Sequence, residues 1–160
     1  IAAVNGACLG GGMEVAIACD MVVAARSAVF SQPEIKLGFL PPYAAVRLPR
    51  LVGPSRAIEI CTTGRRYSAE AMQQMGIVCD LFDDDAFDNG VAKLTKEITH
   101  ASPLIIRLNK NAVTQHVGMT LHDAMDSVND MFLNQLMHTE DTLEGLRSFE
   151  EKRRPEWKNR

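Results

Sequence analysis

The chain has 160 residues, which is enough for one domain with a substantial hydrophobic core. Apolar residues make up 46% and charged residues 23%, and the net charge of −3 gives no reason to expect a nucleic-acid partner. No apolar run reaches the roughly 18 residues that a membrane helix needs, so we expect no membrane partner. The chain starts at Ile1 without an initiator Met or a signal peptide. We therefore expect a piece of a longer, cytoplasmic polypeptide.

The first 31 residues predict an alternation of strands and a helix. The expected elements are a strand at 1–4, a turn at Asn5-Gly6, a short buried helix at 13–18, a buried strand at 20–25 and an extended piece at 29–31. Strand, helix and strand with short joints favour an α/β layer with a crossover helix.

After Pro41-Pro42 the pattern becomes mostly helical. Helices are expected over 43–51, from Pro54 to about 62, and from an N-cap at Ser68 to about Gly76, followed by a short strand at 77–82. The predicted organisation is thus an α/β part over residues 1–82 and a helical tail over residues 83–160.

In the tail, N-cap signals predict where three helices begin. They are Ser102 before Pro103, Thr120 with Asp123 as a capping box, and Thr139 before two acids, with Pro155 expected to end the last helix. Four methionines, Met119, Met125, Met131 and Met137, recur every six residues. This spacing drifts around a helix, so it predicts burial on more than one side, in a core or a subunit interface.

No cysteine pair or histidine spacing is typical of a metal site. The four cysteines form no Cys-x-x-Cys pair, and we expect them to be small core residues. We expect the four histidines to lie at the surface or in an interface. We expect no metal.

The most specific pattern is a glycine triplet followed by an acid, with a second acid further along the chain. Gly10–Gly12 precede Glu14, and Glu34 follows Pro33. Each feature alone has an ordinary explanation, such as close packing of a helix on a strand or an acid at a helix start. A carboxylate in an otherwise apolar helix needs a partner or a task, however. Bare N–H groups flanked by two carboxylates suit acid–base chemistry beside a carbonyl.

These segments resemble the crotonase family of enoyl-CoA hydratases. Residues 4–16 with Cys19-Asp20 are similar to the family signature, and residues 32–38 (QPEIKLG) to its second catalytic segment. Family-like stretches continue at 51–53, 63–65 and 148–153, so that the resemblance runs from Ile1 to about Trp157.

The resemblance implies a crotonase-like ββα spiral and a role for each matching residue. Gly11 would donate half of an oxyanion hole, Gly10 would contact the substrate, and Glu14 and Glu34 would hold a water and move its protons. Phe149 and Lys152 would contact coenzyme A from an adjacent subunit, beside the basic run Lys152–Arg154. The thioester is the substrate and no separate cofactor is implied, while the family's trimers and hexamers predict a homo-oligomer.

The segment after Glu34 departs from the glycine-rich run of many family hydratases. It reads FLPPYAAVRLPR over residues 39–50, so Pro41, Pro42 and Tyr43 should reshape the acyl pocket. This pattern is similar to cyclohexa-1,5-diene-1-carbonyl-CoA hydratases of anaerobic aromatic degradation. Two other enzyme activities remain open, a general 2-enoyl-CoA hydratase and an enoyl-CoA isomerase of fatty-acid oxidation, as does a non-enzymatic assembly protein that keeps the fold.

Overall fold

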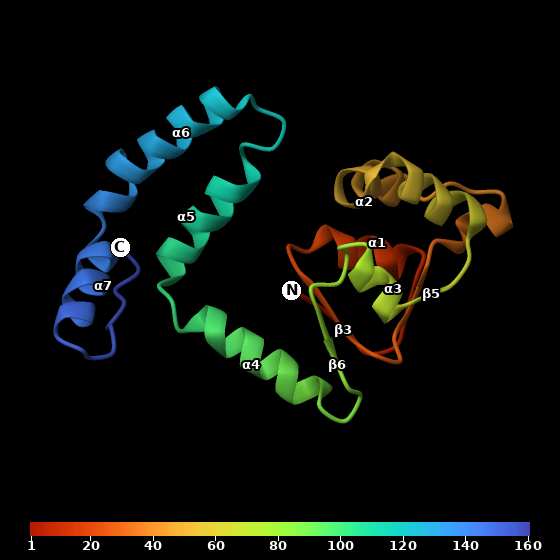
Figure 1. Ribbon diagram of the computed structural model, residues 1–160, viewed down its shortest axis with the longest axis horizontal. Helices are drawn as coiled ribbons and strands as arrows, with labels where there is room; N and C mark the ends of the chain where they lie inside the picture. The colour runs from red at the N-terminus through yellow and green to blue at the C-terminus, as the bar shows by residue number, and fades with distance from the viewer. The chain divides into compact units, whose positions relative to one another are not determined.

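The computed structural model describes all 160 residues, which form two compact units, Ile1–Lys93 and Leu94–Arg160. Figure 1 shows the first unit with its strands and helices and the second as a series of helices. The first unit contains β1 (Ala2–Val4), β2 (Ala7–Leu9), α1 (Gly11–Ala18), β3 (Val22–Ala25), β4 (Val29–Ser31), the 3-10 helix η1 (Pro33–Leu37), α2 (Pro42–Thr63), β5 (Tyr67–Ser68), α3 (Ala69–Gln74) and β6 (Asp80–Phe82).

Two small sheets of three strands organise the first unit. One has the order β1-β3-β6 and is parallel throughout; the other has the order β2-β4-β5, with β2 and β4 parallel and β5 antiparallel. Helix α1 connects β2 to β3 and contacts β1, β2 and α2. This is the α/β layering with a crossover helix that the sequence predicts, although β2 and β5 are not among the expected strands.

Helix α2 covers the region where two separate helices are predicted. Its backbone is continuous by hydrogen bonding but leaves helical geometry at Gly53, where φ is 78° and ψ is 163°. Only glycine takes this conformation readily, so the sequence signal of two helices reflects a real kink. The helix ends at Gly64, which adopts the left-handed conformation expected of a C-terminal glycine.

The second unit is helical and its caps are those that the sequence predicts. Helix α4 (Phe87–Thr99) leads into it, followed by α5 (Pro103–Thr114), α6 (Leu121–Asn134), the 3-10 helix η2 (Leu136–His138) and α7 (Glu140–Glu150). Ser102, Thr120 and Thr139 each accept a backbone N–H with their side-chain oxygen at the start of α5, α6 and α7.

Helix α7 ends at Glu150 rather than at Pro155 as predicted. The chain leaves the helix through Lys152, whose φ is +52°, and Lys152 and Arg153 donate their N–H groups to the carbonyls of Phe149 and Ser148. A residue with φ > 0 closes a helix as glycine usually does, and nothing in the composition of this segment signals it.

Asp141 holds the C-terminal residues onto the second unit. Its buried carboxylate accepts the Ser102 hydroxyl and the backbone N–H groups of Lys158 (2.6 Å) and Asn159 (3.1 and 3.0 Å). Burial by itself would raise the pKa of the Asp141 carboxyl. The hydrogen bonds to Ser102, Lys158 and Asn159 outweigh this effect, so the pKa lies below its usual value. The side chain therefore joins the start of α5, the start of α7 and the chain end.

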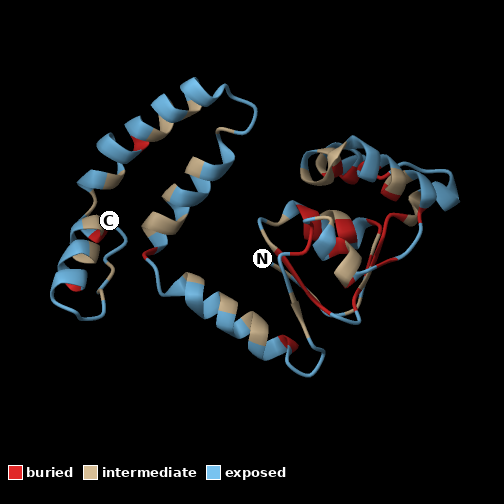
Figure 2. Cartoon of the chain, viewed as in Figure 1, coloured by how far each residue is buried: buried red, intermediate tan, exposed pale blue.

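Burial differs between the two units. Figure 2 shows many buried residues in the strands and α1 of the first unit. Its fully buried large side chains come from α1, β4, α2 and α3: Met13, Phe30, Leu48, Ile60 and Met72. In α6, Met131 is buried whereas Met125 and Phe132 are half-exposed. The sequence predicts that this helix is buried on more than one side, but within this chain only the side that carries Met131 is buried. None of the helices offers an apolar stretch of the length that a membrane-spanning segment requires.

Candidate active site

The start of α1 is built around Gly10. Its φ of 55° and ψ of −127° place it in a region that glycine enters freely, and its N–H donates to the carbonyl of Ser31 at the end of β4 (2.8 Å). The first N–H groups of α1 cannot bond to a carbonyl of the same helix, because no helical turn precedes them, and they lie at the positive end of the helix dipole. A Cβ built on Gly11 or Gly12 meets no atom within 4 Å, so this turn faces open space. Such a turn can approach a negatively charged oxygen closely.

Glu14, in the same first turn, reaches across to α2. Its Oε1 accepts the backbone N–H of Tyr43 (2.8 Å) and of Ala44 (2.9 Å). Pro41, the N-cap residue of α2, makes no capping side-chain bond, so the carboxylate of Glu14 caps this helix from outside. The carboxylate of Glu14 is thereby held at the start of α2 through one of its two oxygens.

Glu34 lies in η1 and its carboxylate is packed against Gly10. A Cβ on Gly10 would stand 2.8 Å from Glu34 Oε1 and 3.9 Å from Pro33 Cδ. Gln32 is fully buried, and in the orientation that its neighbours require its amide donates to Glu34 Oε2 (3.0 Å) and Oε1 (3.2 Å). The second carboxylate is therefore fixed at the N-terminal end of α1.

Cys61 on α2 lies within electrostatic reach of both acids. Burial raises the pKa of its thiol, and the negative charges of Glu34 and Glu14 raise it further. The structure thus brings Gly10, Gly11, Glu14 and Glu34 into one region of the first unit.

The residues predicted to line an acyl pocket stand at the beginning of α2. Pro41 is buried, and Pro42 and Tyr43 are exposed beside the anchor of Glu14. Several neighbouring apolar side chains are also exposed: Leu37, Phe39, Leu40 and Val46. Apolar side chains exposed next to two carboxylates suit an apolar group whose reacting end is handled by acids.

Phe149 and Lys152 lie in the second unit, at the C-terminal end of α7. Phe149 is 83% exposed and Lys152 is exposed. Arg153 binds both oxygens of Glu144 (2.5 and 3.0 Å) and one of Glu151, which lowers the pKa of Glu144 to about 2. Arg153 is therefore committed to the fold of the tail, which leaves Lys152 and Arg154 of the basic run for a ligand.

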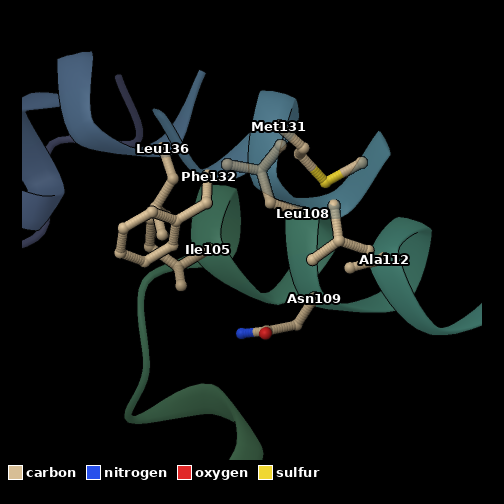
Figure 3. A pocket seen from close by; sticks show the side chains of 8 residues that line it. Ile105, Leu108, Asn109, Ala112, Met131, Phe132 and Leu136 are labelled. Atoms are coloured by element: carbon tan, nitrogen blue, oxygen red, sulfur yellow. The ribbon is translucent and has the colours of Figure 1, made fainter. Parts of the chain in front are cut away.

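The second unit also contains an apolar pocket between α5 and α6. It encloses about 120 Å³ and is lined by Leu108, Met131, Phe132 and their neighbours, with Asn109 at its edge (Figure 3). No titratable group lines it, so it carries no acid–base chemistry. The structure also holds no group of three or more His, Cys, Asp or Glu side chains placed to bind a metal ion.

Gln32 and Cys61 were missed by sequence reasoning. A buried amide directly before Pro33-Glu34 is a usable signal in retrospect, because a fully buried polar side chain needs a partner. Cys61 gives no such signal, since only the packing of α2 brings it near the acids.

Residues 1–160 match the sequence model of the family described as enoyl-CoA hydratase/isomerase. A probable mitochondrial enoyl-CoA hydratase of Dictyostelium discoideum is 37% identical over 161 residues, and a carnitinyl-CoA dehydratase of Salmonella paratyphi A is 37% identical over 164 residues. Each alignment covers 100% of this chain but only 58% and 63% of the relative. The chain thus spans about three fifths of the length of these relatives.

A solved structure has the same fold. The enoyl-CoA hydratase of Bacillus anthracis superposes with a TM-score of 0.90 at 35% identity, over 97% of this chain and 60% of that one. The crotonase-like α/β fold expected from the sequence is confirmed by this similarity.

Proposed function

Because the chain belongs to the enoyl-CoA hydratase/isomerase family, we propose that it carries the acid–base half of a site that adds water to a double bond conjugated to a coenzyme A thioester. The observation that carries the proposal is the fixing of two separate carboxylates, Glu14 by α2 and Glu34 by Gly10 and Gln32, beside the open first turn of α1.

In this reaction the water oxygen bonds to the carbon remote from the thioester, and negative charge builds on the thioester oxygen as an enolate. The N–H of Gly11 would stabilise that charge; a donor of this kind contributes roughly 3–4 kcal/mol. One glutamate accepts a proton from the water and the other delivers a proton to the carbon next to the thioester. A double-bond isomerase can operate with one carboxylate, so two fixed carboxylates favour hydration over isomerisation.

For the acyl group we propose a cyclic dienoyl thioester, because proline and tyrosine side chains at the start of α2 replace a flexible glycine-rich run. Turnover of crotonyl-CoA and of cyclohexa-1,5-diene-1-carbonyl-CoA by the purified protein tests this directly. We expect the higher kcat/KM with the cyclic substrate. A preference for crotonyl-CoA would instead support the general hydratase. No turnover of any acyl-CoA, together with stable binding to another protein, would support an assembly role. The carnitinyl-CoA dehydratase among the relatives makes carnitinyl-CoA a useful third substrate.

We also propose that the helical tail over residues 83–160 mediates assembly into a trimer or hexamer and completes the coenzyme A site. Support comes from large apolar side chains that this chain leaves exposed on its second unit: Leu121 (80%), Leu133 (59%), Leu146 (57%) and Phe149 (83%). Exposure on this scale is typical of surfaces that a partner covers.

Lys152 offers a test of the coenzyme site, because its charge and its backbone strain can be separated. Lys152→Ala is expected to weaken coenzyme A binding while leaving kcat nearly unchanged, since the ammonium group would contact only phosphate. Lys152→Gly should weaken binding equally but raise the free energy of unfolding by about 1 kcal/mol, because glycine takes a φ of +52° without strain. Calorimetric titration with coenzyme A and urea unfolding measure both quantities. Unchanged affinity in both variants would exclude Lys152 from the site.

A further inference from the structure

Gln32 is an unusual residue to find wholly inside a protein. It lies between β4 and η1 with none of its surface exposed, and a buried amide is costly unless its hydrogen bonds are made. With its amide in the orientation that satisfies its neighbours, the nitrogen donates to both oxygens of Glu34, at 3.0 and 3.2 Å. The side chain is thus directed at one carboxylate.

Gly10 also packs against the same carboxylate. A Cβ on Gly10 would stand only 2.8 Å from Glu34 Oε1, which is too close for a van der Waals contact. The bond from the Gly10 N–H to the Ser31 carbonyl ties this glycine to the residue directly before Gln32. Gln32 and Gly10, the two residues that contact the Glu34 carboxylate, are therefore tied to each other through the backbone. This bond continues the pairing of β2 with β4, which resists their separation.

A free glutamate side chain samples many rotamers, and an acid that must deliver a proton to one carbon needs a single orientation. We propose that Gln32 is a positioning residue, which holds the carboxylate of Glu34 against Gly10 in the orientation that its proton transfer requires. The inference rests on the proposed function, in which Glu34 takes part in the chemistry. It adds that the geometry of Glu34 is set by an amide that never touches the substrate.

The test is Gln32→Met, which keeps the length of the side chain and removes both hydrogen-bond contacts. We expect kcat to fall by roughly 10²-fold, as for a modest misplacement of a reacting group, with KM unchanged. Ser31→Ala is the matched control. It removes a buried hydrogen bond from the neighbouring residue, Ser31 Oγ to the Gly64 carbonyl at 3.2 Å, and should leave kcat unchanged.

A double-mutant cycle separates positioning from general stabilisation. If Gln32 acts through Glu34, Gln32→Met should cost little further turnover once Glu34→Gln is present. An equal loss in both backgrounds, or no loss in the single variant, would overturn the proposal. So would a loss of kcat in Ser31→Ala as large as in Gln32→Met.

A crystal structure of Gln32→Met keeps the test independent of the reaction. The Glu34 carboxylate should leave its single position against Gly10 in this variant but not in Ser31→Ala. If the unmodified protein hydrated no acyl-CoA, the proposed function would fail while this measurement still decided whether Gln32 fixes Glu34. A Glu34 side chain in the same place in all three structures would refute the positioning role.

Discussion

Replacing either Glu14 or Glu34 by glutamine is expected to lower kcat for hydration by about 10²–10⁴-fold, the usual contribution of a general acid or base. An amide can neither accept the water proton nor deliver one to carbon. Both variants should fold, because the amide oxygen introduced by Glu14→Gln can still accept the N–H groups of Tyr43 and Ala44, and residue 34 lies partly exposed in η1. Steady-state kinetics with thermal unfolding measures both effects.

Glu14→Ala is the informative companion, because it removes the cap of α2 as well as the acid. It should lose about 1 kcal/mol of stability beyond Glu14→Gln, a typical value for a helix cap. A glutamine variant at either position that turns over at the parental rate would show that hydration does not need two carboxylates.

Gly10→Ala is expected to be damaging for a different reason. The alanine would have to hold a φ of 55°, which costs of order 1–3 kcal/mol, and its methyl group would stand 2.8 Å from Glu34 Oε1. Because the Glu34 side chain can move more easily than the backbone, we expect its carboxylate to leave its position against Gly10. We therefore expect kcat to fall by roughly 10²-fold. Urea unfolding and kinetics on the same preparation test both parts.

Gly12→Ala is the matched control two residues along the same helix. A Cβ there meets nothing within 4 Å and its backbone is ordinary α-helix, so stability should rise by up to about 1 kcal/mol. If Gly10→Ala had the same kcat and free energy of unfolding as Gly12→Ala, the close approach of Glu34 to Gly10 would not matter for the reaction.

The sequence was most informative where local chemistry decides structure. Ser102, Thr120 and Thr139 are N-caps because short side-chain oxygens satisfy the first N–H groups of a helix, and Gly64 ends α2 because glycine accepts φ > 0. The strands β2 and β5 escaped prediction because Ala7–Leu9 and Tyr67–Ser68 are too short to show a period and exist only through pairing with β4.

The candidate site divides in the same way. The sequence alone singles out Glu14 and Glu34 as acids in unusual local motifs. The prediction that the two act together comes from the family resemblance. What holds them is not visible, because the contacts of Glu14 with the α2 backbone and of Glu34 with Gln32 and Gly10 depend on packing between elements.

The anchoring of Glu14 on main-chain N–H groups has a consequence for how such a site can diversify. Every residue type except proline supplies an N–H, so the exposed position 43 can change side chain without releasing the carboxylate, whereas Ala44 is fully buried in the core. The same stretch carries Tyr43 and its exposed apolar neighbours, which would select the acyl group. If these side chains do select the acyl group, mutation at position 43 would change substrate choice while Glu14 keeps its position, because the carboxylate is held by the backbone and not by the side chain.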